Sequence, residues 1–409
     1  MVAGQLRIAM LSAHSCPVGT LGAKDTGGMS VYIRELAGEL GKQGHSVDVY
    51  TRVHDPKDPQ IVTLGQNARL IHLSAGDEEI NKLDVYNYLP DFISNLESFR
   101  QNNNLQYDLI FSHYWMSGWV GQRLQQYWGV PHIIKFHTLG AIKNTFDIGE
   151  REPELRIETE RELVRNCQRI IASTGQERQE LLRHYGAAME RVSIIPCGVN
   201  LERFQPVDKK TARQQLGLPD DKVILFVGRI EPLKGITRLI EAMPHLQNGH
   251  KPRLIIIGGD KNSQSEMERL QSLCHELRIA DSVSFPGMIK QEKLSYYYSA
   301  ADTCVVPSYY ESFGLVALES LACGTPVVAT DVGDLKHIIR QGETGYVVTD
   351  NNPRHLADKI ALVLSKPSAD NGNTLSIRAS VSQFSWSNIA ETIIRECHVV
   401  LADYFATVT

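Results

Sequence analysis

Short apolar runs alternate with amphipathic stretches along almost the whole chain. Residues 6–14 form an apolar run, residues 29–44 have apolar positions at helical spacing, and residues 45–51 form a second apolar run. This order of strand, helix and strand is one βαβ unit. Further strands are expected in the same half at 68–74, 107–113, 131–138 and 169–174. The pattern predicts a parallel sheet with helices on both faces.

Residues 192–206 interrupt this alternation with two prolines and a glycine. Beyond them it restarts, with strands expected at 222–230, 252–259, 282–287, 301–308 and 326–330. We therefore place a domain boundary near Gly198 and predict two doubly wound α/β domains, residues 1–198 and 199–385. Parallel sheets bind ligands beyond the carboxyl ends of their strands, so the ligand should lie between the domains.

The end of the chain has a different pattern. Residues 385–405 have apolar positions at helical spacing over a long stretch, with Ser385 or Ser387 as a candidate cap. This predicts one long amphipathic helix.

Composition narrows the class of protein. The chain has 409 residues, of which 42% are hydrophobic and 22% charged, as in soluble enzymes with two cores. A net charge of -5 argues against nucleic acid as a partner. The start has no basic leader and no apolar run is long enough to span a bilayer, so we expect a cytoplasmic protein without stable membrane insertion. The seven cysteines form no CxxC pair, which favours buried, reduced thiols.

Two carboxylates flank the start of an expected helix in the segment YYESFGLVALES. Glu311 follows the strand at 301–308, the helix should begin at Gly314 or Leu315, and Glu319 lies about one turn inside it. Free N–H groups of a first helical turn favour an anion, whereas carboxylates suit paired hydroxyl groups. A nucleotide diphosphate sugar offers both chemistries. The alternative is a glutamate pair that only complements the helix dipole, and the spacing alone does not separate the two.

Two cations follow another buried strand in VGRIEPLKGI. Arg229 and Lys234 can reach the same edge of the second sheet, where they would neutralise a leaving diphosphate. In isolation, either residue would be read as a solvated surface cation.

The first half carries candidate groups at the corresponding edge of its sheet. Gly27 and Gly28 open a helix, so their amides could approach a phosphate, although a lone glycine pair is weak evidence. The alternative for each histidine that follows a strand is a satisfied core or rim imidazole. Polar side chains after two strands fall at this edge: His113, Tyr114, His137 and Thr138.

Three motifs together carry a family resemblance over almost the whole chain. GRIEPLKG, ESFGLVALES and DTGGMSVYIRELA resemble the retaining glycosyltransferases of family four. The resemblance implies the GT-B fold, in which two Rossmann-like domains face a central cleft, and a final helix, here 386–409, that crosses back onto the first domain. It also implies a nucleotide-sugar donor, with UDP-glucose or UDP-GlcNAc as the expected compounds.

The same resemblance implies residue roles. Glu311 would face the transferred sugar and Glu319 the ribose, as the paired glutamates of the family's E-x7-E motif. His137 would orient the sugar without acting as a general base. The implied catalytic residues are His137, Arg229, Lys234 and Glu311. The implied donor-binding residues are Gly28, Arg229, Lys234, Glu311, Phe313, Gly314, Leu315 and Glu319.

The acceptor implied by the resemblance is phosphorylated. The chain looks similar to the branch that glycosylates inositol phosphates, with sucrose-phosphate synthases as cousins, so inositol phosphate and fructose 6-phosphate both stay open. Ser30 stands where the inositol branch has asparagine, and Met29 where sucrose-phosphate synthases have glutamine. The implied acceptor-binding residues are Lys82, Tyr114, Thr138 and Arg156.

The implied mechanism is front-face transfer with retention, in which a donor phosphate oxygen takes the acceptor proton. No Asp/His metal cluster is evident, so we expect no metal and no cofactor. Two alternatives are a non-hydrolysing nucleotide-sugar epimerase and a catalytically inactive nucleotide-sugar-binding protein. A homodimer is compatible with the sequence but is not predicted by it.

Overall fold

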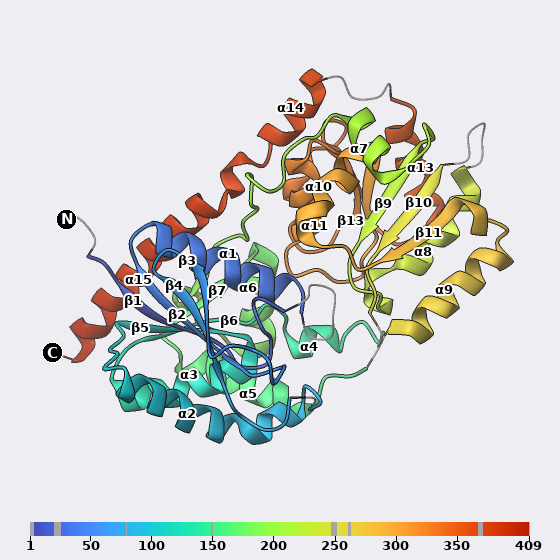
Figure 1. Ribbon diagram of the computed structural model, residues 1–409. Coiled ribbons are helices and arrows are strands. Elements are labelled where there is room, and N and C mark those ends of the chain that lie inside the picture. The colour runs from blue at the N-terminus through green and yellow to red at the C-terminus, as the bar shows by residue number, and fades with distance from the viewer. Residues whose placement is uncertain are drawn as a thin grey trace.

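The computed structural model describes residues 4–19, 26–78, 80–148, 150–246, 252–260, 263–366 and 371–408. It contains two α/β domains, each built on one sheet, that lie side by side in Figure 1. Both ends of the chain lie beside the first domain.

The first domain contains an eight-stranded sheet in the order β3-β4-β2-β1-β5-β6-β7-β8. The expected parallel pairing is confirmed, and among the described strands of this sheet β3 alone runs antiparallel to its neighbour. Sequence reasoning missed β3 and β8, and the latter lies inside the segment that was expected only to interrupt the pattern. The strands are β1 (Arg7–Ser12), β2 (Ser46–Arg52), β3 (Ile61–Gly65), β4 (Ala68–Leu73), β5 (Leu109–His113), β6 (His132–Lys135), β7 (Arg169–Ala172) and β8 (Val192–Ile194).

The second domain contains a parallel six-stranded sheet in the order β11-β10-β9-β12-β13-β14. Its edge strand β14 was not expected from the sequence. The strands are β9 (Val223–Val227), β10 (Arg253–Ile257), β11 (Val283–Gly287), β12 (Thr303–Val306), β13 (Val327–Thr330) and β14 (Gly345–Val348).

Helices cover both sheets. They are α1 (Gly28–Lys42), α2 (Leu89–Asn102), α3 (Tyr114–Trp128), α4 (Gly140–Lys143), α5 (Glu154–Asn166), α6 (Gly175–Tyr185), α7 (Lys209–Leu216), α8 (Ile236–Ala242), α9 (Gln264–Glu276), α10 (Gln291–Ala300), α11 (Leu315–Ala322), α12 (Leu335–Ile338), α13 (Pro353–Leu364), α14 (Asn371–Ala379) and α15 (Trp386–Val408).

Side chains that alternate along β1 enter different cores. Ile8 and Met10 pack with α1 and α15, whereas Ala9 and Leu11 pack with α2, α3 and α5 on the opposite face. Figure 1 shows the two groups of helices above and below the first sheet. Because both faces are buried, the strands are nearly continuous apolar runs, and that is why they could be predicted.

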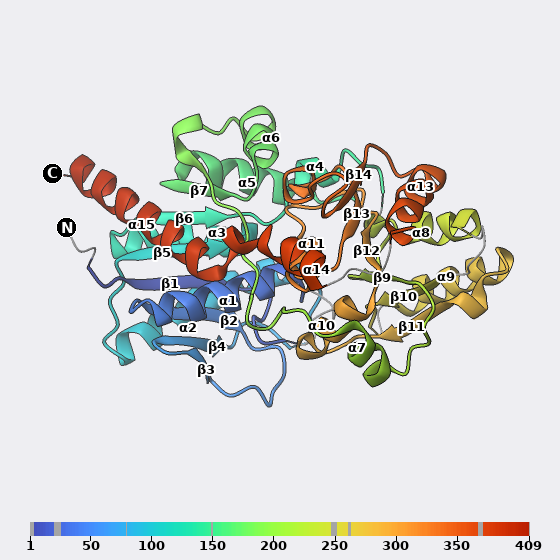
Figure 2. The ribbon, with the colours of Figure 1, turned by 90° about the horizontal axis from the view of Figure 1, so that it is seen from above.

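The last helix crosses back onto the first domain, as expected. Figure 2 shows α15 leaving the second domain near α14 and ending beside the first sheet. Ser385 caps it, since the backbone N–H of Asn388 donates to the Ser385 hydroxyl over 3.3 Å. Ile389 and Ile393 are buried in the core shared with α1, and Gln43 donates to the Ser387 carbonyl over 3.1 Å.

Two stretches of chain connect the domains, and they lie against each other. The backbone N–H of Val199 donates to the Phe384 carbonyl over 2.7 Å, and Val199 also forms a parallel bridge with Ser385. Gly198 faces the Trp386 ring so closely that an ideal Cβ atom would lie 2.5 Å from it. The exact domain boundary near Gly198 stays a prediction.

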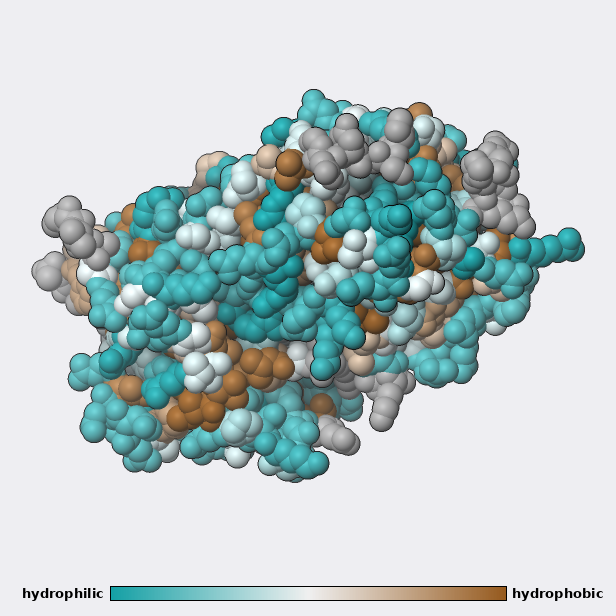
Figure 3. All heavy atoms as spheres, turned by 45° about the horizontal axis from the view of Figure 1, so that its top comes forward, coloured by the Kyte–Doolittle hydropathy of each residue, from teal (hydrophilic) through white to brown (hydrophobic). Residues whose placement is uncertain are grey.

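The cysteines and the molecular surface agree with the class of protein expected from the composition. All seven cysteines are free and buried, as expected from their spacing. Within the described ranges, no helix combines the length and apolarity that crossing a membrane requires. Figure 3 shows a largely hydrophilic face, with its main group of hydrophobic residues on the first-domain side.

The contact between Gly198 and Trp386 generates a stability prediction. Gly198→Ala should lower the free energy of unfolding by about 1–3 kcal/mol, because the added methyl group overpacks the contact between the two connecting stretches. Gly175→Ala is the matched control, since nothing lies within 4 Å of its Cβ position, and it should leave stability unchanged or slightly raised. Urea unfolding measures both, and equal midpoints for the two variants would contradict the prediction.

Candidate active site

A cavity of about 350 Å³ lies between the carboxyl ends of the two sheets. Its walls include the loops that follow β1, β4, β5 and β6 in the first domain and β9, β10, β11 and β12 in the second. Of the candidate groups from the sequence, His113 lies buried behind the wall, whereas all the implied catalytic, donor-binding and acceptor-binding residues line the cavity: Gly28, Lys82, Tyr114, His137, Thr138, Arg156, Arg229, Lys234, Glu311, Phe313, Gly314, Leu315 and Glu319. Proximity is thus established for the whole set, while the role of each residue stays a prediction.

The two implied diphosphate-binding cations each have a carboxylate partner. Lys234 Nζ lies 2.6 Å from Glu311 Oε1, and the Ser308 hydroxyl donates to the same oxygen over 2.8 Å. Arg229, whose side chain is half exposed, lies 2.9 Å from Glu231. A diphosphate that reaches Lys234 must therefore compete with Glu311 for its N–H groups.

The helix that follows Glu311 begins where the sequence predicted. Gly314 has φ +117, and an ideal Cβ there would lie 2.6 Å from Leu335, so this position requires glycine. Phe313 is buried, with its ring centroid 6.0 Å from that of Phe384. The first turn of α11 lines the cavity through Leu315 and Val316.

Glu319 is the buried carboxylate of the site. The Tyr298 hydroxyl donates to its Oε2 over 2.7 Å, and the Gln291 side chain also hydrogen-bonds to it. Burial raises the pKa of Glu319 to about 7 despite these donors. A ligand with hydroxyl donors would favour its charged form.

Two histidines lie together on the first-domain side. His137 lines the cavity, and its Nε2 is 3.0 Å from Nδ1 of His113, which is fully buried beneath it. Burial holds the pKa of both rings well below the usual value, so both are neutral at pH 7. His137 has φ 62, a strained conformation typical of functional sites. A neutral, fixed imidazole suits the orienting role expected for His137.

The implied acceptor residues form a cluster around one ring. Lys82 Nζ lies 4.5 Å and the Arg156 guanidinium 4.7 Å from the Tyr114 ring centroid. Tyr114 has φ 76, and the His14 ring is 4.4 Å from it. Two cationic side chains therefore lie against the Tyr114 ring in this wall of the cavity.

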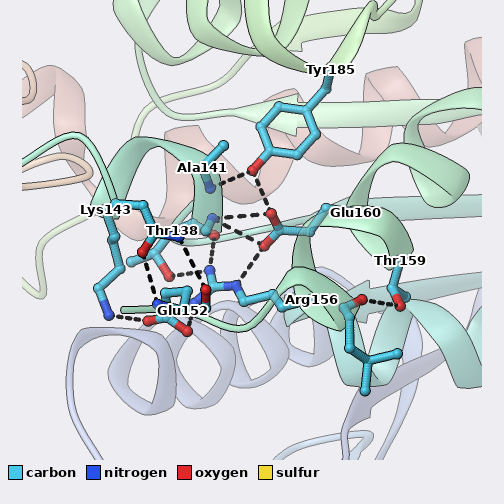
Figure 4. A network of polar contacts seen from close by, with 11 residues as sticks. Thr138, Ala141, Lys143, Glu152, Arg156, Thr159, Glu160 and Tyr185 are labelled. Atoms are coloured by element: carbon cyan, nitrogen blue, oxygen red, sulfur yellow. Dashed lines mark hydrogen bonds and ion pairs between the residues drawn. The ribbon is translucent and has the colours of Figure 1, made fainter. Parts of the chain in front are cut away.

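Arg156 is engaged within the protein on every side (Figure 4). Its Nε donates to Glu160 over 2.7 Å, its Nη1 lies 2.8 Å from Glu152, and its Nη2 donates to the carbonyl and hydroxyl of Thr138 over 2.7 and 3.0 Å. Burial opposes its charge, but Glu160 and its neighbours raise the pKa of Arg156. Arg156 is thus a buried member of an ion-pair network, although several neighbours on α5 are charged and exposed.

Sequence reasoning missed several cavity residues. Lys143 lines the cavity and pairs with Glu152, as Figure 4 shows. Burial raises the pKa of Glu152, yet Arg156 and Lys143 together lower it to about 2. Tyr310 reaches across from the second domain, where its ring centroid lies 5.7 Å from that of Phe146. A lysine shortly after His137 was visible in the sequence, but the inward turn of Tyr310 had no sequence signal.

Among the described residues, no group of three or more His, Cys, Asp or Glu side chains is arranged to hold a metal ion. Transfer without a metal stays a prediction.

Comparison with known proteins shows which family has this arrangement of domains and motifs. A family model described as Glycosyltransferase Family 4 matches residues 26–203, and one described as Glycosyl transferases group 1 matches residues 208–376. D-inositol 3-phosphate glycosyltransferase 2 of Catenulispora acidiphila is 41% identical over 94% of this chain and 92% of its own length. The chain belongs to glycosyltransferase family 4.

Two further comparisons support the assignment of this chain to glycosyltransferase family 4. D-inositol 3-phosphate glycosyltransferase of Corynebacterium glutamicum is 37% identical over 93% of this chain and 96% of its own length. The structure of sucrose-phosphate synthase from Thermosynechococcus elongatus superposes with a TM-score of 0.89 at 34% identity, covering 98% of this chain and 100% of that one. The GT-B fold expected from the motifs is confirmed.

The Arg156 network predicts that the implied acceptor residues differ in their structural importance. Arg156→Ala should cost about 3–5 kcal/mol of unfolding free energy, because it leaves the fully buried Glu160 carboxylate without its cationic partner. Lys82→Ala removes a contact with the Tyr114 ring and should cost no more than about 1 kcal/mol. Urea unfolding measures both variants.

Glu160→Gln is the partner variant for this test. Combined with Arg156→Ala, it should recover part of the loss, because the most buried carboxylate of the network is no longer charged. Purely additive losses would contradict the assigned network.

Proposed function

We propose that this glycosyltransferase moves a hexosyl unit from a UDP-sugar, UDP-glucose or UDP-GlcNAc, to a small phosphorylated acceptor with retention of configuration. The observation that carries the proposal is the division of one cavity into two charged walls. Arg229, Lys234 and the α11 N-terminus lie on the second domain, and the Lys82, Tyr114 and Arg156 cluster faces them from the first. Two anionic groups of two substrates fit such a cavity.

The donor would bind on the second domain. Its diphosphate would exchange with Glu311 for Lys234 and reach Arg229, and its ribose hydroxyls would donate to Glu319. Glu311 would then be available to a hydroxyl of the transferred sugar. His137, neutral and fixed by His113, would orient that sugar from the first domain.

Retention is proposed through front-face attack. Glu311 is already hydrogen-bonded to Lys234 and Ser308, which does not favour it as a covalent nucleophile. The acceptor hydroxyl would attack the anomeric carbon while its proton passes to a donor phosphate oxygen, and the bond to the UDP oxygen breaks. Arg229 and Lys234 stabilise the charge that develops on the diphosphate, so the proposal requires no metal ion.

The acceptor is proposed to carry a phosphate because of Lys82, Arg156 and Lys143. Relatives named for D-inositol 3-phosphate and a neighbour named sucrose-phosphate synthase support this class. Inositol phosphate and fructose 6-phosphate are both retained. A non-hydrolysing epimerase or an inactive nucleotide-sugar-binding protein would have no use for this second charged wall.

The decisive experiment is mass spectrometry of products from a grid of donors and acceptors. UDP-glucose and UDP-GlcNAc are each incubated with fructose 6-phosphate, inositol 1-phosphate or inositol 3-phosphate, and with the dephosphorylated analogues, with and without EDTA. A hexosylated phosphorylated acceptor is expected with at least one pair and not with its dephosphorylated analogue. Conversion of the donor alone would indicate an epimerase, and bound UDP without any product would indicate an inactive binding protein.

Lys82→Ala sharpens this test. It should raise the KM for the phosphorylated acceptor by roughly ten- to a hundredfold, since one charge-assisted bond is lost, while the donor KM hardly changes. Lys42→Ala, an exposed lysine of α1 with its own carboxylate partner, is the matched control and should change neither value. A Lys82→Ala enzyme that keeps its acceptor KM would contradict the assigned phosphate site.

Glu319 predicts a pH dependence of nucleotide binding. Only the carboxylate accepts both ribose hydroxyls, and its pKa is about 7 in the free protein. The affinity for UDP should therefore be about tenfold weaker at pH 6 than at pH 8, with release of a proton on binding. Titration calorimetry in buffers of different ionisation enthalpy measures both quantities.

The terminal phosphate of UDP also titrates in this range, with a pKa of about 6, so a baseline is required. Glu319→Gln supplies it, because an amide does not ionise. The same pH dependence in Glu319→Gln and the wild type would rule out Glu319 as its source.

A further inference from the structure

A chain of buried and half-buried polar side chains runs from Glu319 to the connection between the domains. It comprises Arg34 and Glu35 of α1, Asn200 and Arg203 of the connecting stretch, and Gln291 at the start of α10, and we call these residues the interdomain polar chain. Gln291 and Glu319 are 6% and 8% exposed. The interdomain polar chain therefore includes residues of both domains and of the stretch that connects them.

The contacts of the interdomain polar chain are short. Arg34 and Arg203 both donate to Gln291 Oε1, over 2.5 and 2.9 Å. Arg203 also pairs with Glu35 over 2.5 Å, and Asn200 donates to the second oxygen of Glu35 over 2.8 Å.

The orientation of the Gln291 amide follows from this arrangement. Arginine has no acceptor, so the oxygen of Gln291 must face Arg34 and Arg203. Its NH₂ group is then the part of Gln291 that can donate to Glu319, which lines the same cavity and also accepts from the Tyr298 hydroxyl. Gln291 is consequently locked as a donor to the carboxylate and an acceptor from two arginines.

Helix α1 gives the interdomain polar chain a second connection to the cavity, besides Gln291. Its first residue, Gly28, lines the cavity, and Arg34 lies about 9 Å further along the same helix. A change in the angle between the domains would move Arg34 relative to Gln291. Arg34 and Arg203 themselves are not among the residues that line the cavity.

We propose that Gln291 is a positioning residue that fixes the Glu319 carboxylate for the nucleotide and couples nucleotide binding to the contact between the domains. The inference rests on the proposed function, since it takes UDP as the ligand of Glu319. It adds that Arg34 and Arg203 influence UDP affinity through Gln291 without touching the nucleotide.

Two substitutions of Gln291 separate its two contacts. Gln291→Met removes both, and UDP should bind at least about fivefold more weakly. Gln291→Glu keeps an acceptor for the arginines but loses the donor to Glu319 and adds a like charge beside it, so a larger loss is expected. Gln264→Met, on the exposed start of α9, is the matched control and should leave the Kd unchanged.

A double-mutant cycle tests the coupling. Arg203→Met alone should weaken UDP binding about threefold or more, although the side chain lies outside the cavity. In the Gln291→Met background the same substitution should lose at least half of its effect on the binding free energy. The remainder is the direct charge of Arg203 acting on Glu319.

Titration calorimetry, well below the unfolding temperature, measures the Kd for UDP of the wild type and of each variant. A wild type that binds no UDP would contradict the proposed function and remove the ligand on which this inference rests. A wild type that binds UDP, with unchanged affinity in Gln291→Met or with fully additive effects in the cycle, would overturn this inference alone. If the Gln291 variants do not fold, Arg203→Met and Arg34→Met decide, because unchanged Kd values in both would overturn it equally.

Discussion

The two connecting stretches of chain hold the cavity in place by pairing with each other. The Val199 hydrogen bond to Phe384 and the packing of Gly198 on Trp386 make one short seam out of segments far apart in the sequence. Because this seam belongs to the stretches that connect the two domains, small rotations about it would open or close the cavity without disturbing either sheet. The polar groups that line the cavity can therefore be brought to a ligand from both sides.

Most cationic groups of the cavity are already paired with carboxylates of the protein when no substrate is bound. Arg156, Arg229 and Lys234 each have a carboxylate within 3 Å, on Glu152 and Glu160, Glu231, and Glu311 respectively. A phosphate gains these cations only by displacing or sharing their partners, so net affinity is smaller than the contacts suggest. The same competition favours ligands that offer hydroxyl groups to the released carboxylates. Sugar phosphates and nucleotide sugars have this combination.

Much of this site could be predicted because strand ends in a parallel sheet define a common edge. Four site residues follow apolar runs: Tyr114, His137, Arg229 and Glu311. The runs could be recognised in the sequence because both faces of each sheet are buried. Edge strands such as β3 have exposed, irregular patterns, which explains why it was missed. The buried ion pair of Arg156 and Glu160 was not predicted, because the sequence does not show that this part of α5 is covered. Gln291 had no signal, because its importance comes entirely from partners on other elements.

The position of α15 has a consequence for biosynthesis. Ile389, Ile393 and Val400 complete the hydrophobic core that contains Ile33 and Leu36 of α1, although they are translated after the second domain. While residues 199 to 408 are being translated, one face of the first domain has no cover. At about 5–20 residues per second, this interval lasts roughly 10 to 40 seconds. Until α15 leaves the exit tunnel, the nascent first domain thus exposes to the ribosome surface and to chaperones the apolar surface that α15 later covers.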